Sequence, residues 1–264
     1  MEKVNGIAVH DEGDRAGQPI VLIHGFPFNR MMWAPQIEAL SKTCRVISYD
    51  VRGHGQSDAG EGNYTMEFFV DDLLGVLDHL KIRRVIVCGL SMGGYIALRA
   101  VERHSERFSG LILCDTKSSA DSEEVKKKRA MTAEAVEKNG VSVFADEFAK
   151  AVLAEATLAT KPRIVETVKN MIRGNSAPNI ARTLLAIAGR TDTTLALPRM
   201  SLRALVLVGD QDKLTPPASA EIMASALPNA EMHLIPAAGH LANLENPADF
   251  NEKLLNFLEN NSFS

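Results

Sequence analysis

Six short apolar runs recur along this chain of 264 residues, and amphipathic segments lie between most of them. The runs are residues 20–23, 46–49, 85–88, 111–114, 204–208 and 232–235. Continuous runs of this kind are typical of parallel strands that helices cover on both faces. Residues 66–80, 218–227 and 248–258 keep the apolar spacing of amphipathic helices. The alternation predicts an α/β fold with a mostly parallel, doubly wound sheet, and residues 6–11 predict an antiparallel edge strand or hairpin.

One stretch interrupts this alternation between two of the predicted strands. Residues 116–198 contain no convincing strand pattern, and glycines and prolines separate about four helical segments there. These segments are residues 122–138, 141–153, 164–172 and 180–187. Such an insertion is most simply a cap, so we expect a core of residues 1–115 and 199–264 and a cap of residues 116–198. Its apolar side chains are expected to line an apolar pocket, with Phe144, Phe148 and Met171 as candidates for ligand contact.

A glycine-flanked serine follows the predicted strand 85–88 in the sequence Gly89-Leu90-Ser91-Met92-Gly93. This G-x-S-x-G pattern, between a strand and a helix, is typical of a nucleophile elbow. Glycines are needed because a sharp turn brings strand and helix close together and strains the serine. The turn exposes the Ser91 hydroxyl at a helix N-terminus, where the backbone N–H of Met92 can donate to an oxyanion. The motif predicts Ser91 as the nucleophile of an acyl transfer.

A serine nucleophile needs a base, and His240 is the best-placed histidine in the sequence. It lies in a loop after the last predicted strand, and catalytic groups gather at the carboxyl ends of parallel strands. Four other histidines lie on predicted strands or helices and are interpreted as surface or packing residues. They are His10, His79, His104 and His233.

The base in turn needs a carboxylate that holds its tautomer, and three aspartates follow predicted strands. Asp210 and Asp212 come after the strand 204–208, and spacing alone does not choose between them. Asp115 ends the strand 111–114 and is a reserve candidate, although an aspartate there is more often a cap or a loop hydrogen-bond acceptor. The order Ser91, Asp212, His240 is that of the α/β-hydrolases.

A second oxyanion donor is expected from the turn His24-Gly25-Phe26-Pro27, which follows the strand 20–23. The donor would be the backbone N–H of Phe26, whereas His24 is interpreted as a structural hydrogen-bonding residue. A second glycine-containing loop, residues 50–57, also ends a strand, and Arg52 is expected to pair with a carboxylate inside that loop.

With these motifs, the chain resembles the α/β-hydrolase superfamily, in the group of small carboxylesterases, enol-lactonases and cofactor-free perhydrolases. The resemblance covers nearly the whole chain and rests on residues 24–33, 50–57, 89–95, 209–217 and 237–247. It implies Asp212 as the acid, His240 as the base, Phe26 and Met92 as oxyanion donors, and a cap formed by the helical insertion.

The resemblance implies a serine carboxylesterase that hydrolyses short- to medium-chain esters through an acyl-enzyme and needs no cofactor. Serine at position 91 argues against dehalogenase and epoxide-hydrolase relatives, which use an aspartate nucleophile. A lactonase or enol-lactonase with the same triad is the alternative, and Arg30 could then bind a substrate carboxylate. A carbon–carbon bond hydrolase, or a ligand receptor that kept the fold, are further alternatives.

Charge and motifs exclude other classes of function. The net charge of −4 gives no electrostatic reason to bind nucleic acid or an anionic membrane, and no metal-ligand or dinucleotide motif is present. The basic cluster Lys126-Lys127-Lys128-Arg129 follows two glutamates and predicts a solvated helix face. The three cysteines form no C-x-x-C pair and the opening residues are not apolar, so a cytoplasmic location is expected. No oligomeric state is predicted.

Overall fold

An eight-stranded sheet forms the centre of the protein, whose computed structural model describes residues 2–263. The strands are β1 (Glu2–Val4), β2 (Ile7–Gly13), β3 (Gln18–Ile23), β4 (Cys44–Tyr49), β5 (Val85–Leu90), β6 (Phe108–Cys114), β7 (Arg203–Gly209) and β8 (Ala230–Ile235). Their order is β1-β2-β4-β3-β5-β6-β7-β8. The six strands from β4 to β8 in this order pair in parallel, and β2 pairs antiparallel with β1 and β4. The predicted α/β class with a mostly parallel sheet is confirmed.

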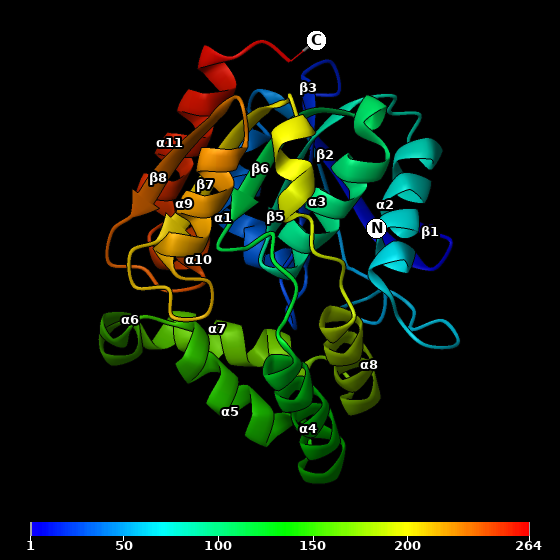
Figure 1. The fold of residues 1–264 in the computed structure, drawn as a ribbon, viewed down its shortest axis with the longest axis vertical. Coiled ribbons are helices and arrows are strands. Elements are labelled where there is room, and N and C mark those ends of the chain that lie inside the picture. The colour runs from blue at the N-terminus through cyan, green and yellow to red at the C-terminus, as the bar shows by residue number, and fades with distance from the viewer. Residues whose placement is uncertain (1, 264) are drawn as a thin grey trace.

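Helices cover both faces of this sheet (Figure 1). They are α1 (Ala34–Leu40), α2 (Met66–His79), α3 (Met92–Arg103), α9 (Pro217–Ala226), α10 (Ala242–Glu245) and α11 (Pro247–Asn260), with short 3-10 helices η1 (Arg30–Trp33) and η2 (Ser105–Arg107). Helices α2 and α3 pack together, as do α1 and α11. Every residue of β5 and β6 is buried, as expected for strands covered on both faces.

The edge strand β8 departs from that expectation. Only Ile235 of its six residues is buried, because β8 is the last strand and has a neighbour on one side only.

No helix within residues 2–263 combines the length and the apolar character that crossing a bilayer requires.

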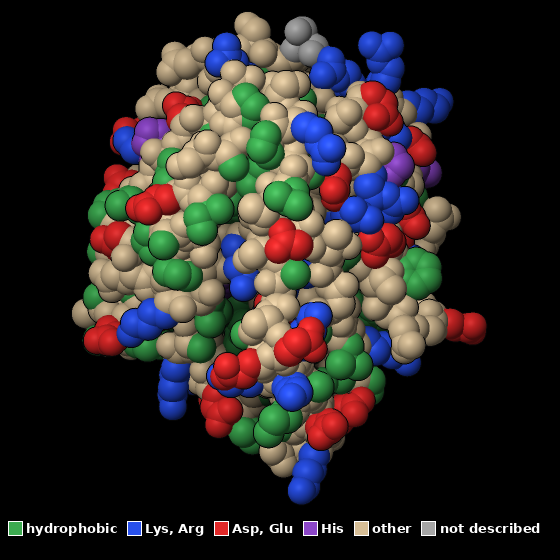
Figure 2. Space-filling view, viewed as in Figure 1, with side chains coloured by type: hydrophobic (Ala, Val, Ile, Leu, Met, Phe, Trp, Pro, Cys, Tyr) green, Lys and Arg blue, Asp and Glu red, His purple; other side chains and the backbone are tan. Residues whose placement is uncertain are grey.

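The chain between β6 and β7 forms a separate layer of helices, which we call the helical insertion. It consists of α4 (Glu123–Asn139), α5 (Val141–Val152), α6 (Glu155–Thr160), α7 (Pro162–Arg173), α8 (Ala177–Ala188) and the 3-10 helix η3 (Thr194–Arg199). Helices α4 to α8 lie together beyond one end of the sheet (Figure 1), where α4 packs on α8 and α5 packs on α7. The side chains of Ser122 and Ser176 cap α4 and α8 by accepting backbone N–H groups. Lys/Arg and Asp/Glu side chains are interspersed over the face in Figure 2.

Candidate active site

The turn between β5 and α3 holds Ser91 in a strained backbone conformation. Its φ is +53°, a value that non-glycine residues seldom adopt. The close approach of strand and helix requires glycine on both sides, because a Cβ atom at Gly89 would lie 2.2 Å from the carbonyl oxygen of Gly93. A Cβ atom at Gly93 would lie 2.1 Å from the carbonyl oxygen of Ile23. The turn therefore holds the Ser91 hydroxyl above the carboxyl end of the sheet, as its glycine spacing predicts.

Three side chains that are far apart in the sequence form a chain of hydrogen bonds. Oγ of Ser91 lies 2.8 Å from Nε2 of His240, and Nδ1 of His240 lies 2.8 Å from Oδ2 of Asp212. The side chains of His240 and Asp212 are almost fully buried. With Nδ1–H donating to a carboxylate, Nε2 is left to accept the proton of the Ser91 hydroxyl. This is the geometry that a Ser-His-Asp triad requires.

Local hydrogen bonds keep Asp212 ionised although it is buried. Its Oδ1 accepts the backbone N–H groups of Leu214 at 2.8 Å and Thr215 at 3.1 Å, and the Thr215 hydroxyl donates to Oδ2 at 2.7 Å. Burial alone would raise the pKa of Asp212, but the charge of His240 and these hydrogen bonds outweigh it and lower the pKa. Sequence reasoning did not select Thr215, although aspartate side chains in turns commonly accept hydrogen bonds from residues that follow them closely.

The two other candidate acids lie elsewhere. Asp210 is exposed, and its carboxylate accepts the backbone N–H of Ala238 at 3.3 Å. Asp115 is fully buried and accepts the backbone N–H of Gly209 at 2.8 Å. Burial and the neighbouring charge of Asp212 raise the pKa of Asp115 well above its usual value. Neither side chain is hydrogen-bonded to His240 in the described residues, so Asp212 is the partner of that histidine.

The turn after β3 lies against Ser91. A Cβ atom at Gly25 would lie 3.4 Å from Cβ of Ser91, and Phe26 lines the same cavity as Ser91. Met92 is the first residue of α3, so its N–H has no partner within the helix. Neither the N–H of Phe26 nor that of Met92 donates to another protein group within residues 2–263. Both donors are therefore available to an oxygen atom bound beside Ser91.

Three basic side chains near these loops have structural contacts. Nε2 of His24 accepts the backbone N–H of Val51 at 2.8 Å, and burial lowers the pKa of His24 to about 4. Arg52 pairs with Asp72 of α2, so the expected partner inside its own loop is wrong. Arg30, the candidate for binding a substrate carboxylate, lies 3.8 Å from Glu12 and does not line the cavity beside Ser91.

A cavity of about 240 Å³ lies between the core and the helical insertion, beside Ser91 and His240. Helices α4, α5 and α8 supply part of its wall. Its lining residues are Phe26, Ser91, Tyr95, Lys117, Asp121, Val125, Arg129, Phe148, Ile187, Leu214, Thr215 and His240. Six of these twelve side chains are apolar or aromatic, and three are charged. The cavity can therefore hold an apolar chain that ends near a charged group.

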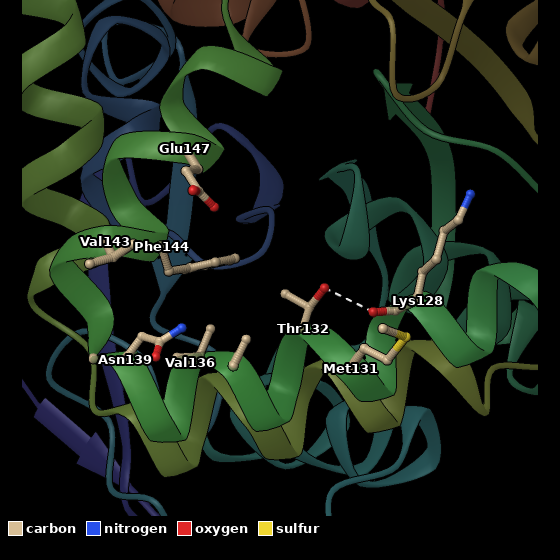
Figure 3. A pocket seen from close by; sticks show the side chains of 10 residues that line it. Lys128, Met131, Thr132, Val136, Asn139, Val143, Phe144 and Glu147 are labelled. Atoms are coloured by element: carbon tan, nitrogen blue, oxygen red, sulfur yellow. Dashed lines mark hydrogen bonds between the residues drawn. The ribbon is translucent and has the colours of Figure 1, made fainter.

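Only one of the three candidate insertion residues lines this cavity. Phe148 does, whereas Phe144 stacks on Phe148 with ring centroids 5.2 Å apart and lines a second cavity, of about 490 Å³, between α4 and α5 (Figure 3). Met171 is buried and lines neither cavity. In Figure 3, Phe144 extends from α5 into the space above α4. Phe144 therefore packs behind the wall of the cavity beside Ser91, and Met171 is not part of that wall.

Sequence reasoning missed the charged residues of the cavity, which are Lys117, Asp121 and Arg129. The basic cluster was expected to be solvated throughout, and Lys126 and Lys128 do pair with glutamates on the exposed face of α4. Arg129 instead lies four residues after Val125, on the face of α4 that meets the cavity. The four-residue spacing from Val125 is the feature of the sequence that could have identified Arg129 as a residue of the cavity.

No group of three or more His, Cys, Asp or Glu side chains in residues 2–263 is arranged to hold a metal ion. The arrangement at Ser91 can instead transfer a proton from a hydroxyl to an imidazole and place two N–H groups around an oxyanion.

Comparison with known proteins supports the fold and the class of chemistry. The sequence model of the family described as "alpha/beta hydrolase fold" matches residues 18–247. The chain is 28% identical over 244 residues to 3-oxoadipate enol-lactonase 2 of Acinetobacter baylyi, covering 92% of this chain and 89% of that one. A thermophilic esterase from Thermogutta terrifontis is 38% identical with a TM-score of 0.92, covering 96% of this chain and 93% of that one. The enol-lactonase from Burkholderia xenovorans LB400 is 33% identical with a TM-score of 0.89, covering 97% and 98%.

Proposed function

Because the chain belongs to the alpha/beta hydrolase fold family, we propose that it is a serine carboxylesterase acting on short- to medium-chain esters. The observation that carries this proposal is the chain of 2.8 Å hydrogen bonds from Ser91 through His240 to Asp212. An esterase and two enol-lactonases among its relatives support hydrolysis of a carboxylic ester bond.

In the first step, Oγ of Ser91 attacks the ester carbonyl while its proton passes to Nε2 of His240. The carbonyl oxygen becomes an oxyanion, and the N–H groups of Phe26 and Met92 donate to it. The ester C–O bond then breaks, and the alkoxide leaves with the proton from His240. The product is an acyl-enzyme on Ser91 and a free alcohol.

In the second step, a water molecule attacks the acyl-enzyme and gives its proton to Nε2 of His240. The bond from the acyl carbon to Oγ of Ser91 breaks, Ser91 recovers the proton, and the carboxylic acid leaves. Asp212 remains ionised throughout, in keeping with its lowered pKa, and stabilises the imidazolium that forms in each step.

The helical insertion would act as a cap that sets substrate size. Phe148 of α5 and Ile187 of α8 lie in the cavity wall opposite the core. Each methylene buried there adds about 0.8 kcal/mol of binding until the cavity is full, so acyl chains of roughly two to eight carbons should be preferred.

Lactone hydrolysis is the second candidate, because relatives at 28% and 33% identity are named enol-lactonases. A lactone is a cyclic ester, so the same residues would open it by the same two steps. The alcohol would then remain attached to the acyl group, and one product would leave instead of two.

A panel of aryl esters of increasing acyl length, run beside simple lactones, tests the proposal. A carboxylesterase turns over many times and has its highest kcat/KM within the short to medium esters. Faster turnover of lactones than of every ester would favour the second candidate. A single turnover, with no further product, would indicate a ligand receptor and contradict both.

A further inference from the structure

A buried cluster of charged side chains adjoins the cavity beside Ser91. At its centre is Asp121, whose side chain is fully buried. Two nitrogens of the Arg190 guanidinium lie 2.8 Å from its two oxygens, Nε of Arg129 lies 2.5 Å away, and Nζ of Lys117 lies 3.5 Å away. One carboxylate therefore faces three cations.

In the described part of the chain, Asp121 is the only carboxylate within 4 Å of these three cations. Asp192 is influenced by the charge of Arg190, but its oxygens accept the backbone N–H groups of Ala120 and Thr194. No cation of the cluster lies within 4 Å of Asp192. Burial lowers the pKa of Lys117 most, and the charge of Arg190 lowers it further. An additional anion would be attracted to this place.

The three cations of the cluster have different surroundings. Arg190 is 5% exposed, holds Asp121 with two nitrogens, and lies over the ring of Tyr95 at 4.3 Å, so its role is structural. Lys117 and Arg129 line the cavity with Ser91 and His240, and their side chains are 23% and 24% exposed. The two terminal nitrogens of Arg129 donate to no group in the described residues. These donors are open to the cavity.

We propose that Lys117 and Arg129 form a subsite for a carboxylate carried by the substrate, so that the preferred ester or lactone has a free carboxylate away from its scissile bond. This inference rests on the proposed function and specifies its substrate class. A guanidinium and an ammonium that are partly removed from water bind a carboxylate by charge-assisted hydrogen bonds, which are about twice as strong as neutral ones. The apolar wall of Phe26, Phe148 and Ile187 would hold the chain between the two ends of the substrate.

The test compares two series of substrates with the wild-type enzyme. The acidic series is the monoethyl esters of the dicarboxylic acids from succinic to pimelic acid, and the neutral series is the ethyl esters of monocarboxylic acids of matching length. At low salt and pH 8, the best acidic ester should have a kcat/KM at least about ten-fold above its neutral match, and mainly through KM. Added sodium chloride should reduce this preference ratio, because the subsite is partly exposed.

Variants then assign the preference to these two side chains. Lys117→Gln and Arg129→Gln should each lower the acidic-to-neutral ratio of kcat/KM several-fold, toward one. Lys128→Gln is the matched control, because Lys128 is the neighbour of Arg129 on α4, pairs with Glu124 and does not line the cavity beside Ser91. It should leave the ratio unchanged.

The inference and the proposed function fail in different ways. A wild-type ratio of one or below, with neutral esters still hydrolysed, would overturn the carboxylate subsite and leave the esterase proposal intact. An equal loss on both series in Lys117→Gln and Arg129→Gln would also overturn it, because the two residues would then serve structure only. An absence of turnover on both series would overturn the two proposals together.

Discussion

The backbone N–H of His240 donates to the carbonyl oxygen of Val152 at 2.8 Å, so the helical insertion is hydrogen-bonded to the loop of the proposed base. Glu245 holds the two segments on either side of this contact. Its Oε1 accepts the N–H of Gly239 and its Oε2 accepts the N–H of Ala154, both at 2.8 Å. The side chain is buried, so both bonds are protected from water.

Glu245→Gln should therefore lower kcat, because the amide nitrogen cannot accept one of these N–H groups. An unsatisfied buried donor costs about 1–3 kcal/mol, and His240 would lose its fixed position. We expect a fall of about ten-fold or more in kcat with little change in KM, measured on a short-chain ester. Glu252→Gln, at an exposed glutamate of α11, is the control and should have no effect. A raised KM at unchanged kcat would show that Glu245 shapes substrate binding and does not position His240.

Asp212→Asn should cost far more turnover than Asp210→Asn or Asp115→Asn. Asparagine can present its amide nitrogen to Nδ1 of His240, which favours the tautomer that cannot accept the Ser91 proton. The expected loss in kcat is several powers of ten for Asp212→Asn. Steady-state measurement of kcat for the three variants tests this order. A comparable loss of kcat in Asp115→Asn would identify the residue that follows β6 as the acid.

Asp115→Asn should stabilise the protein increasingly as pH rises. The pKa of Asp115 is raised in the folded protein, mainly by burial, so above about pH 4 the unfolded chain loses this proton while the folded one retains it. The contribution of the Asp115 carboxyl to the free energy of unfolding is therefore present at low pH. It declines as pH rises toward the pKa that this carboxyl has in the folded protein. Asparagine keeps an acceptor for Gly209 and tolerates the φ of +44° at this position.

Denaturant unfolding of Asp115→Asn and wild type between pH 5 and pH 8 measures this effect. The difference in unfolding free energy should grow with pH in favour of the variant. A difference that stays constant across this range would mean that the Asp115 carboxyl does not titrate abnormally.

Phe148→Ala should shift the preferred acyl length upward. The Phe148 ring forms part of the cavity wall and packs against Phe26 with centroids 5.9 Å apart, so its removal enlarges the space beside Ser91. The acyl length with the highest kcat/KM should increase by a few carbons, at about 0.8 kcal/mol for each newly buried methylene. Met171→Leu, at a buried residue outside the cavity, should leave the optimum unchanged. An unchanged optimum in Phe148→Ala would place the acyl chain elsewhere.

The parallel strands could be predicted because burial on both faces removes polar residues from them, as in β5 and β6. The partial exposure of β8 could not be predicted, because the sequence of a strand does not show whether that strand lies at the edge or in the middle of the sheet. Helix α6 has only six residues, too few for a helical period to be visible. Residues 6–11 were expected to form an antiparallel edge strand or hairpin, and β2 does pair antiparallel with β1 at the edge of the sheet.

The residues of the site could be predicted where a tight glycine turn or the position of a loop constrains them. They could not be predicted where the packing of helices determines which side chains reach the cavity. The residues around Ser91 are required by the tight turn after β5, and the structure joins Ser91, His240 and Asp212 by hydrogen bonds. The choice of Asp212 over Asp210 depends on the path of one loop. The place of Arg129 depends on which face of α4 meets the core, and that follows from how the whole insertion packs.

Covalent labelling by a fluorophosphonate, mapped by mass spectrometry of peptides, identifies the nucleophile of this protein directly. We predict one adduct per chain, on Ser91, formed in step with the loss of ester hydrolysis. Ser91→Ala should take up no label and lose at least about a thousand-fold in kcat, while its unfolding midpoint stays close to that of the wild type. Label on another residue, or wild-type turnover in Ser91→Ala, would show that Ser91 is not the nucleophile.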